Sequence, residues 1–144
     1  MSTNALISKQ NADGSIRTVY AHWDGYPSYM GKMLALNYAD EAKVDALLDE
    51  GNISSLEENV GEKHDFEDYD WFCENKATSF YGRDREDDDQ NAVLYANREE
   101  YNKGTADFSC VEYEYMWIDG VWHYSKRHAE WVVIDPANLE NLPG

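Results

Sequence analysis

The sequence predicts an α+β fold, with an antiparallel or mixed β-sheet and two to three helices packed on one face of it. Three observations predict this class. Residues 5–22 alternate around a loop that ends in Asp-Gly, residues 26–50 have helical periodicity, and residues 110–125 alternate around a second Asp-Gly pair. A chain of 144 residues can bury close to 70% of its extended surface, and it contains no linker or repeat. We therefore expect one domain over residues 1–144.

The N-terminal part predicts a β-hairpin followed by a helix. Residues 5–10 and 15–22 are the two strands of the hairpin. The segment VYAHWDGYPSYMGKMLALNY, residues 19–38, reads as a strand that ends in a tight polar turn and leads into a helix. Asp24-Gly25 is the turn dipeptide, and Pro27 suits the first turn of a helix from about Tyr26 to Tyr38.

A second helix is predicted from the cap residue Asp40 to about Glu50, with Gly51-Asn52 as its stop. Its inward stripe consists of Val44, Leu47 and Leu48. The pattern is lost over residues 53–70, where apolar residues are scattered in an acidic background. We expect an ordered loop without a regular element there.

The following segments alternate between short elements and loops. Residues 77–81 predict a short strand, and residues 82–89 predict an exposed loop because nothing in this charged run could be buried unpaired. Residues 92–96 predict a strand. Asn97 followed by Glu100 fits a capping box for a short helix that ends at Gly104.

The C-terminal part is predicted to be mainly β. Residues 110–118 and 121–125 form the clearest hairpin of the sequence, with Asp119-Gly120 as its two-residue turn. Residues 131–134 are an apolar run that would be a buried strand if it paired centrally in the sheet. Asp135-Pro136 breaks this run, and the tail after it is expected to fray.

The composition predicts a folded acidic protein. Hydrophobic residues make up 42% of the chain, and 29 acidic against 12 basic residues give a formal net charge of -17. This charge argues against direct binding to nucleic acid or anionic membranes and favours a basic partner. No secretory signal or long apolar segment is visible, so we expect a cytoplasmic location.

Two dense groups of carboxylates are the candidate partner-binding residues. Duplex DNA carries one negative charge per roughly 1.7 Å of its axis, so carboxylates at similar spacing could occupy a DNA-binding channel. The alternative is a solvated surface that only maintains solubility. The candidate residues are Asp45, Asp49, Glu57, Glu58, Glu62, Asp65, Glu67, Asp68, Asp70, Asp84, Glu86, Asp87, Asp88 and Asp89.

Catalytic and metal chemistry have weaker signals. His22 and Asp24 could act as general base and orienter, or could join His64 and Asp65 as metal ligands, but no ligand spacing of a known metal motif is present. No GxSxG motif is present, and acidic surroundings would disfavour a thiolate. We therefore predict no enzyme, no cofactor and no metal site, and keep a small enzyme or ligand-binding domain at this turn as an alternative.

Three further residue types leave interpretations open. Cys73 and Cys110 lie far apart and are expected to be reduced, partly buried thiols. Arg83 and Arg85 are expected to pair with neighbouring carboxylates, and the alternative is a small patch that binds an anion or contacts a partner. A third function would be an interaction module that binds a protein partner by an aromatic surface. The aromatic residues that could be core or interface anchors are Tyr26, Tyr29, Trp71, Tyr81, Trp117 and Trp122.

Several segments together resemble a family of small, mostly uncharacterised proteins of tailed bacteriophages and prophages. They are HWDGYPSYMGKML at residues 22–34, ISSLEENVGEKHDF at 53–66, FYGRDRED at 80–87 and the tyrosine-rich hairpin at 113–124. The resemblance implies an accessory phage protein in the cytoplasm of a bacterial host. It suggests an inhibitor of a bacterial defence protein, such as a restriction enzyme or CRISPR effector, or of another protein with a basic nucleic-acid-binding surface. A homodimer is left open.

Overall fold

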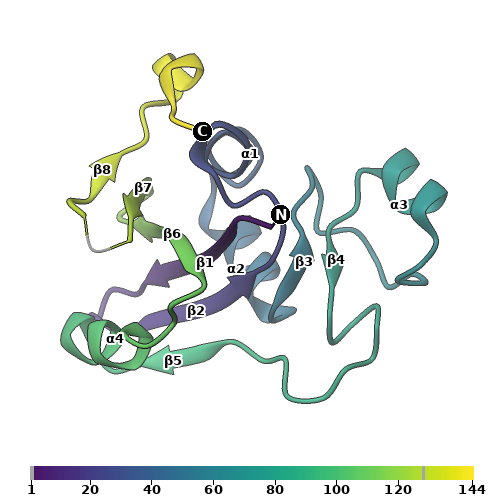
Figure 1. Cartoon of the computed structure of the whole chain (residues 1–144), viewed down its shortest axis with the longest axis horizontal. Coiled ribbons are helices and arrows are strands. Elements are labelled where there is room, and N and C mark those ends of the chain that lie inside the picture. Colours follow the sequence, from purple (N-terminus) through teal and green to yellow (C-terminus); the bar gives the residue numbers. More distant parts are fainter. Residues whose placement is uncertain (1, 128) are drawn as a thin grey trace.

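The computed structural model of the chain describes residues 2–127 and 129–144 (Figure 1). Eight strands within these residues form one sheet in the order β4-β3-β2-β1-β6-β7-β8, and β5 pairs with β2 beside β3. β1 pairs with β6 and β2 with β3 in parallel, and the other pairings are antiparallel. The strands are β1 (Asn4–Gln10), β2 (Ile16–Ala21), β3 (Ile53–Ser55), β4 (Ser79–Phe80), β5 (Val93–Tyr95), β6 (Val111–Ile118), β7 (Val121–Lys126) and β8 (Val132–Val133).

Helices connect and cover this sheet. They are the π-helical turn η1 (Pro27–Gly31), which continues directly into α1 (Lys32–Asn37), then α2 (Glu41–Asp49), α3 (Tyr69–Asn75), α4 (Arg98–Thr105) and the 3-10 helix η2 (Pro136–Asn141). The mixed sheet with helices against it confirms the predicted α+β class.

The core lies between one sheet face and the first two helices. Side chains of β1 alternate, so Ala5 and Ile7 face this core with Leu34 of α1 and Leu47 of α2. The opposite sheet face packs against α4, where Tyr101 meets Ile16 and Met116. β1 is therefore covered on both faces, as its nearly continuous burial shows.

The two predicted hairpins and the second helix are confirmed. β1 pairs with β2, and β6 pairs with β7 around Asp119-Gly120. The Asp40 side chain accepts a hydrogen bond from the Lys43 amide and caps α2, whose buried residues are Val44, Leu47 and Leu48. Asn97 caps α4 in the same way through the Glu100 amide.

The prediction for residues 53–70 was wrong in two places. β3 lies at the start of this range, where three residues are too few to produce a visible alternation. α3 begins at Tyr69 and is capped by Asp68, which accepts from the Trp71 amide. None of the side chains of α3 is fully buried, so the helix leaves no apolar stripe in the sequence.

The C-terminal segment also differs from its prediction. β8 pairs with β7 at the edge of the sheet, so Val132 and Val133 are 45% and 56% exposed, and only Ile134 is buried. The tail after it does not fray, because Leu139 of η2 is buried and the Pro143 carbonyl accepts a hydrogen bond from the Ser28 amide. The C-terminus accordingly lies next to α1 (Figure 1).

Gly51 provides a test of this fold at the end of α2. Its φ is +85°, and a Cβ added there would lie 2.0 Å from the Gln90 carbonyl oxygen. Gly14 has a similar φ of +91° but open space around it. We expect Gly51→Ala to lower the free energy of unfolding clearly more than the roughly 1–2 kcal/mol that a left-handed conformation costs an alanine, and Gly14→Ala to lower it by that amount only. Urea unfolding of both variants measures this, and equal losses would contradict the close approach of residues 51 and 90.

Candidate functional site

The carboxylates of α2 face bases on the sheet. The Lys9 ammonium, whose side chain is 9% exposed, lies 2.8 Å from Asp45 and 3.5 Å from Glu41. Arg17 pairs with Asp45 at 3.1 Å and also with Asp49. Asp45 and Asp49 were predicted to bind a partner, and the structure shows that both have counter-charges within the chain.

Asp84 is buried, although it lies in the run that predicted an exposed loop. Its Oδ2 accepts a hydrogen bond from the Phe80 amide at 2.9 Å, and its Oδ1 accepts from the His64 amide and from Arg83 Nε, both at 3.0 Å. A buried carboxylate is tolerable when it is paired and hydrogen-bonded in this way. Asp84 therefore joins the 61–64 segment to β4 and cannot contact a partner.

The two arginines of this loop bind carboxylates, as expected. Arg83 pairs with Asp84 and, at 3.5 Å, with Glu50. Arg85 pairs with Asp87 at 3.3 Å, and its guanidinium carbon lies 5.6 Å from the ring centre of Phe66. Asp87 is thus also partly neutralised within the chain.

Two exposed ion pairs involve further candidate residues. Glu58 pairs with Lys76 at 3.6 Å, and Glu86 pairs with Lys63 at 3.4 Å. Exposed pairs of this kind contribute little to stability, about 0–1 kcal/mol each. The Lys63–Glu86 pair shows that the two acidic segments of the sequence lie side by side.

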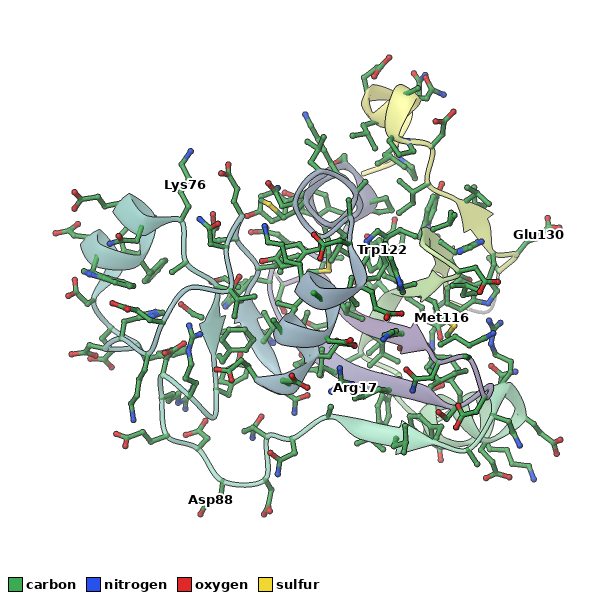
Figure 2. All side chains as sticks on the ribbon, turned by 180° about the vertical axis from the view of Figure 1, so that it is seen from behind. Arg17, Lys76, Asp88, Met116, Trp122 and Glu130 are labelled. Atoms are coloured by element: carbon green, nitrogen blue, oxygen red, sulfur yellow. The ribbon has the colours of Figure 1, made fainter. Side chains whose placement is uncertain are left out.

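Seven candidate carboxylates remain exposed and have no ion-pair partner within residues 2–127 and 129–144. Five of them lie in residues 62–70, before and at the start of α3, and two lie in the loop before β5, on the side of the molecule away from β8 (Figures 1 and 2). We call these residues the acidic end. They are Glu62, Asp65, Glu67, Asp68, Asp70, Asp88 and Asp89.

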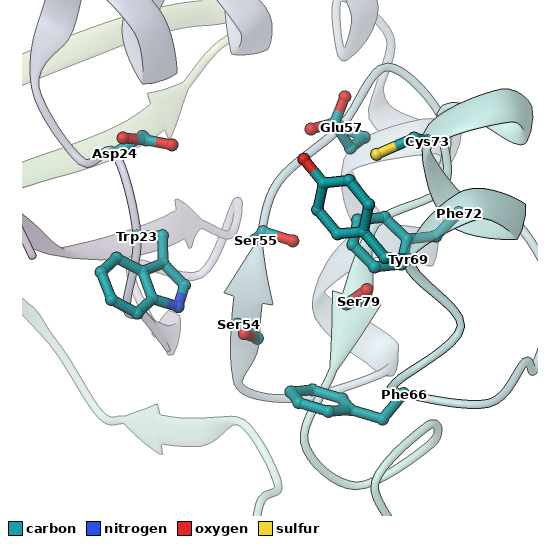
Figure 3. A pocket seen from close by; sticks show the side chains of 10 residues that line it. All are labelled: Trp23, Asp24, Ser54, Ser55, Glu57, Phe66, Tyr69, Phe72, Cys73 and Ser79. Carbon is teal, nitrogen blue, oxygen red and sulfur yellow. The ribbon is translucent and has the colours of Figure 1, made fainter.

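A cavity of about 310 Å³ opens at the same end, between the turn after β2 and α3 (Figure 3). Trp23 forms one side, and Phe66, Tyr69 and Phe72 form the other. The Trp23 amide donates to the Ser54 carbonyl at 3.0 Å, which holds the turn beside β3. The sequence analysis missed this cavity; the aromatic residues of the segment before β4 were its only local signal.

The carboxylates of Glu57 and Asp24 also line this cavity. Glu57 Oε2 accepts a hydrogen bond from the Tyr29 hydroxyl at 3.0 Å. Partial burial raises the pKa of Glu57 above its ordinary value of 4.5, and the nearby Glu58 and Asp24 carboxylates raise it further, against the opposing effects of the Tyr29 hydroxyl and Lys76. Glu57 is thus a partly desolvated carboxylate that faces like charges.

His64 lies between Ser79 and Asp84. Its Nε2 is 3.3 Å from Ser79 Oγ, and its Nδ1 is 3.5 Å from Asp84 Oδ1 but only 3.0 Å from the Glu62 carbonyl oxygen. The ring also stacks on Trp71. In a Ser-His-Asp triad the carboxylate holds Nδ1, whereas here the carbonyl is nearer and Asp84 already accepts three N–H groups. We assign His64 a structural role that holds its loop against β4.

The alternative metal site does not assemble. His22 Nδ1 lies 2.8 Å from the Tyr20 hydroxyl, whereas His64 contacts Ser79. In the part of the chain that the structure describes, no group of three or more His, Cys, Asp or Glu side chains could hold a metal ion. Cys73 and Cys110 are free and exposed, and not partly buried as expected.

No family model, curated protein or solved structure matches this chain. Among the described residues, no helix combines the length and apolar character needed to cross a membrane. Function is therefore inferred from the charges and the cavity at the acidic end.

Substitution of Asp84 tests whether its buried carboxylate stabilises the fold by joining the 61–64 segment to β4. In Asp84→Asn one carboxylate oxygen becomes an NH₂ group that faces N–H donors, so we expect the free energy of unfolding to fall by about 3 kcal/mol or more. Asp88→Asn, in the same loop but exposed, is the matched control and should change it by less than about 0.5 kcal/mol. Chemical denaturation measures both. Similar small losses in the two variants would contradict a structural role of Asp84.

Glu57→Gln tests whether the fold disfavours ionisation of the Glu57 carboxylate. Because the pKa of Glu57 is raised in the folded state, the fold binds this proton more tightly than the unfolded chain does, and stability falls as the pH rises above the unfolded value. Gln removes this ionisation and keeps an acceptor for Tyr29. We expect the variant to be more stable than the parent at pH 7, with the difference vanishing at acid pH below the unfolded pKa. Thermal unfolding at several pH values measures this, and parallel pH profiles would refute it.

Proposed function

We propose that this chain is a binding protein whose acidic end occupies a basic, nucleic-acid-binding surface on a partner protein. One observation carries the proposal: seven exposed carboxylates without an ion-pair partner among the described residues lie in residues 62–70 and in the loop before β5, on the side of the molecule where an aromatic cavity opens. Several bases elsewhere in the chain are engaged in ion pairs, for example Lys9 and Arg17 beneath α2. The seven carboxylates of the acidic end are exposed, so a partner can reach them.

The physical mechanism is charge replacement. Lys and Arg side chains that normally contact phosphates would contact carboxylates of the acidic end, and both surfaces would release counterions. Association of this kind weakens as the salt concentration rises, and duplex DNA competes with it directly. The chain itself, with a net charge of -17, would not bind nucleic acid.

Residues 22–34 and 80–87 resemble segments of phage proteins, and the identity of the partner is proposed from this resemblance. It supports a phage-encoded inhibitor that acts in the cytoplasm of the bacterial host. The partner would be a defence protein, such as a restriction enzyme or CRISPR effector, or another nucleic-acid-processing protein. The resemblance supports the bacterial host as the place of action, and the charge distribution supports binding to a basic surface.

A second function is favoured by the aromatic surface. Trp23 is 45% exposed and Tyr69 is 69% exposed, although large aromatic side chains usually bury most of their area. An interaction module that binds mainly through these rings would keep its partner at high salt and ignore DNA. Salt dependence and DNA competition therefore separate the two functions.

Charge removal at the acidic end tests the first function. The variant Glu62→Gln, Glu67→Gln, Asp70→Asn and Asp88→Asn leaves the ion pairs and the lining of the cavity intact. Tagged protein is used to capture partners from bacterial lysate at low and at high salt, with duplex DNA as competitor. We expect the parent to retain a nucleic-acid-binding protein that DNA displaces, and the variant to lose it by roughly tenfold or more, because four charge contacts are removed.

The matched control removes the same charge elsewhere, by Asp107→Asn, Glu112→Gln, Glu130→Gln and Glu140→Gln. These residues are exposed, and Glu130 lies at the opposite side of the molecule from α3 (Figure 2). The control should retain the partner. Equal capture by the parent and both variants would refute binding through the acidic end.

A further inference from the structure

We propose that the cavity between Trp23 and α3 binds one cationic side chain, the ammonium or guanidinium group of a Lys or Arg residue that a basic partner inserts. The inference rests on the proposed function, because it names the chemistry by which the acidic end anchors its partner. The negative charge of the acidic end predicts a basic partner, and the cavity adds that one Lys or Arg side chain of this partner is bound between aromatic rings.

The walls of the cavity have the character of an aromatic cage. The ring of Trp23 stands on one side, and Tyr69, Phe72 and Phe66 stand on the other, with β3 between them (Figure 3). Aromatic faces attract cations through their negative π-surfaces when the cation lies within about 6 Å of the ring centre. Rings on two sides would also cover the aliphatic stem of a Lys or Arg side chain.

The charge of the cavity selects a cation. Glu57 and Asp24 both line it, and among the described residues no Lys or Arg does. Lys76 lies near Glu57, but it is mostly exposed and pairs with Glu58 at 3.6 Å. A cation entering the cavity would therefore meet two carboxylates whose mutual repulsion it relieves.

Other ligand classes fit less well. An anion would be repelled by both carboxylates, and a purely apolar group would displace water from Glu57 and Asp24 without replacing their hydrogen bonds. At about 310 Å³ the cavity is at the lower limit of small-molecule sites, which suits a single side chain better than a nucleotide or a larger cofactor. The hydroxyls of Ser54, Ser55 and Ser79 line the same space and are further acceptors for an ammonium or guanidinium group.

The test uses amino-acid amides as probes and nuclear magnetic resonance of the ¹⁵N-labelled full chain. N-acetyl-lysine methylamide and N-acetyl-arginine methylamide are titrated, with N-acetyl-norleucine methylamide as the neutral control. We expect saturable shifts of the Trp23 indole N–H and of the Ser54 and Ser55 amides with the two cationic probes only. Equal shifts with the norleucine probe, or no shifts with any probe, would overturn the assignment.

Two variants locate the binding. Glu57→Gln, which is expected to fold at least as well as the parent, and Trp23→Leu should each weaken binding of the lysine probe by about fivefold or more. Asp88→Asn removes a charge at the acidic end but outside the cavity, and should leave the affinity within about twofold. An unchanged affinity of folded Glu57→Gln would overturn the proposed role of the cavity.

The two proposals fail separately. The four-residue variant of the acidic end keeps the whole lining of the cavity, so it should still bind the lysine probe. If it binds the probe but captures the same proteins as the parent, the proposed function is refuted and the cation site is supported. If no probe binds while the variant loses its partner, the cation site is refuted and the proposed function is supported.

Discussion

The pairing of Lys9 and Arg17 with the carboxylates of α2 joins this helix to the central strands of the sheet. An ammonium as deeply placed as that of Lys9 needs a counter-charge, because removing one partner of such a pair is costly. α2 supplies it, since Val44 and its apolar neighbours turn one face to the core and bring Asp45 over the sheet. Both bases are engaged beneath α2, so they do not offset the carboxylates between β3 and β5.

The sequence predicted an element correctly where its turn residues, cap residues or apolar pattern lie within the element itself and match its burial in the fold. Both hairpins carry an Asp-Gly turn between alternating segments, and α2 has a cap, a stripe and a stop within twelve residues, 40–51. α3 was missed because its aromatic side chains face a cavity and form no buried stripe. The edge position of β8 follows from its pairing with β7, which no feature of residues 131–134 specifies.

The candidate site was predictable in its residue types but not in their environments. The run from residue 84 to 89 looks uniformly exposed, yet Asp84 meets the amides of Phe80 and His64 and is buried. Asp45 meets Lys9 from a strand 36 positions earlier. Such distant pairings depend on topology, and so does the cavity, whose lining comes from the turn after β2, from β3, from α3 and from β4.

The cavity is also the place where the chain departs from what stability alone requires. Tyr69 and Trp23 expose much of their rings, and the Glu57 carboxylate is partly buried beside Asp24, where its ionisation is disfavoured. The two core clusters do not include any residue of α3, so the fold does not need this helix to keep aromatic rings at the surface. Unfavourable local features that cluster in one cavity are typical of functional sites, where a ligand relieves them. A cation between the rings and the carboxylates would do so, since it cancels the repulsion and covers the apolar surface in one step.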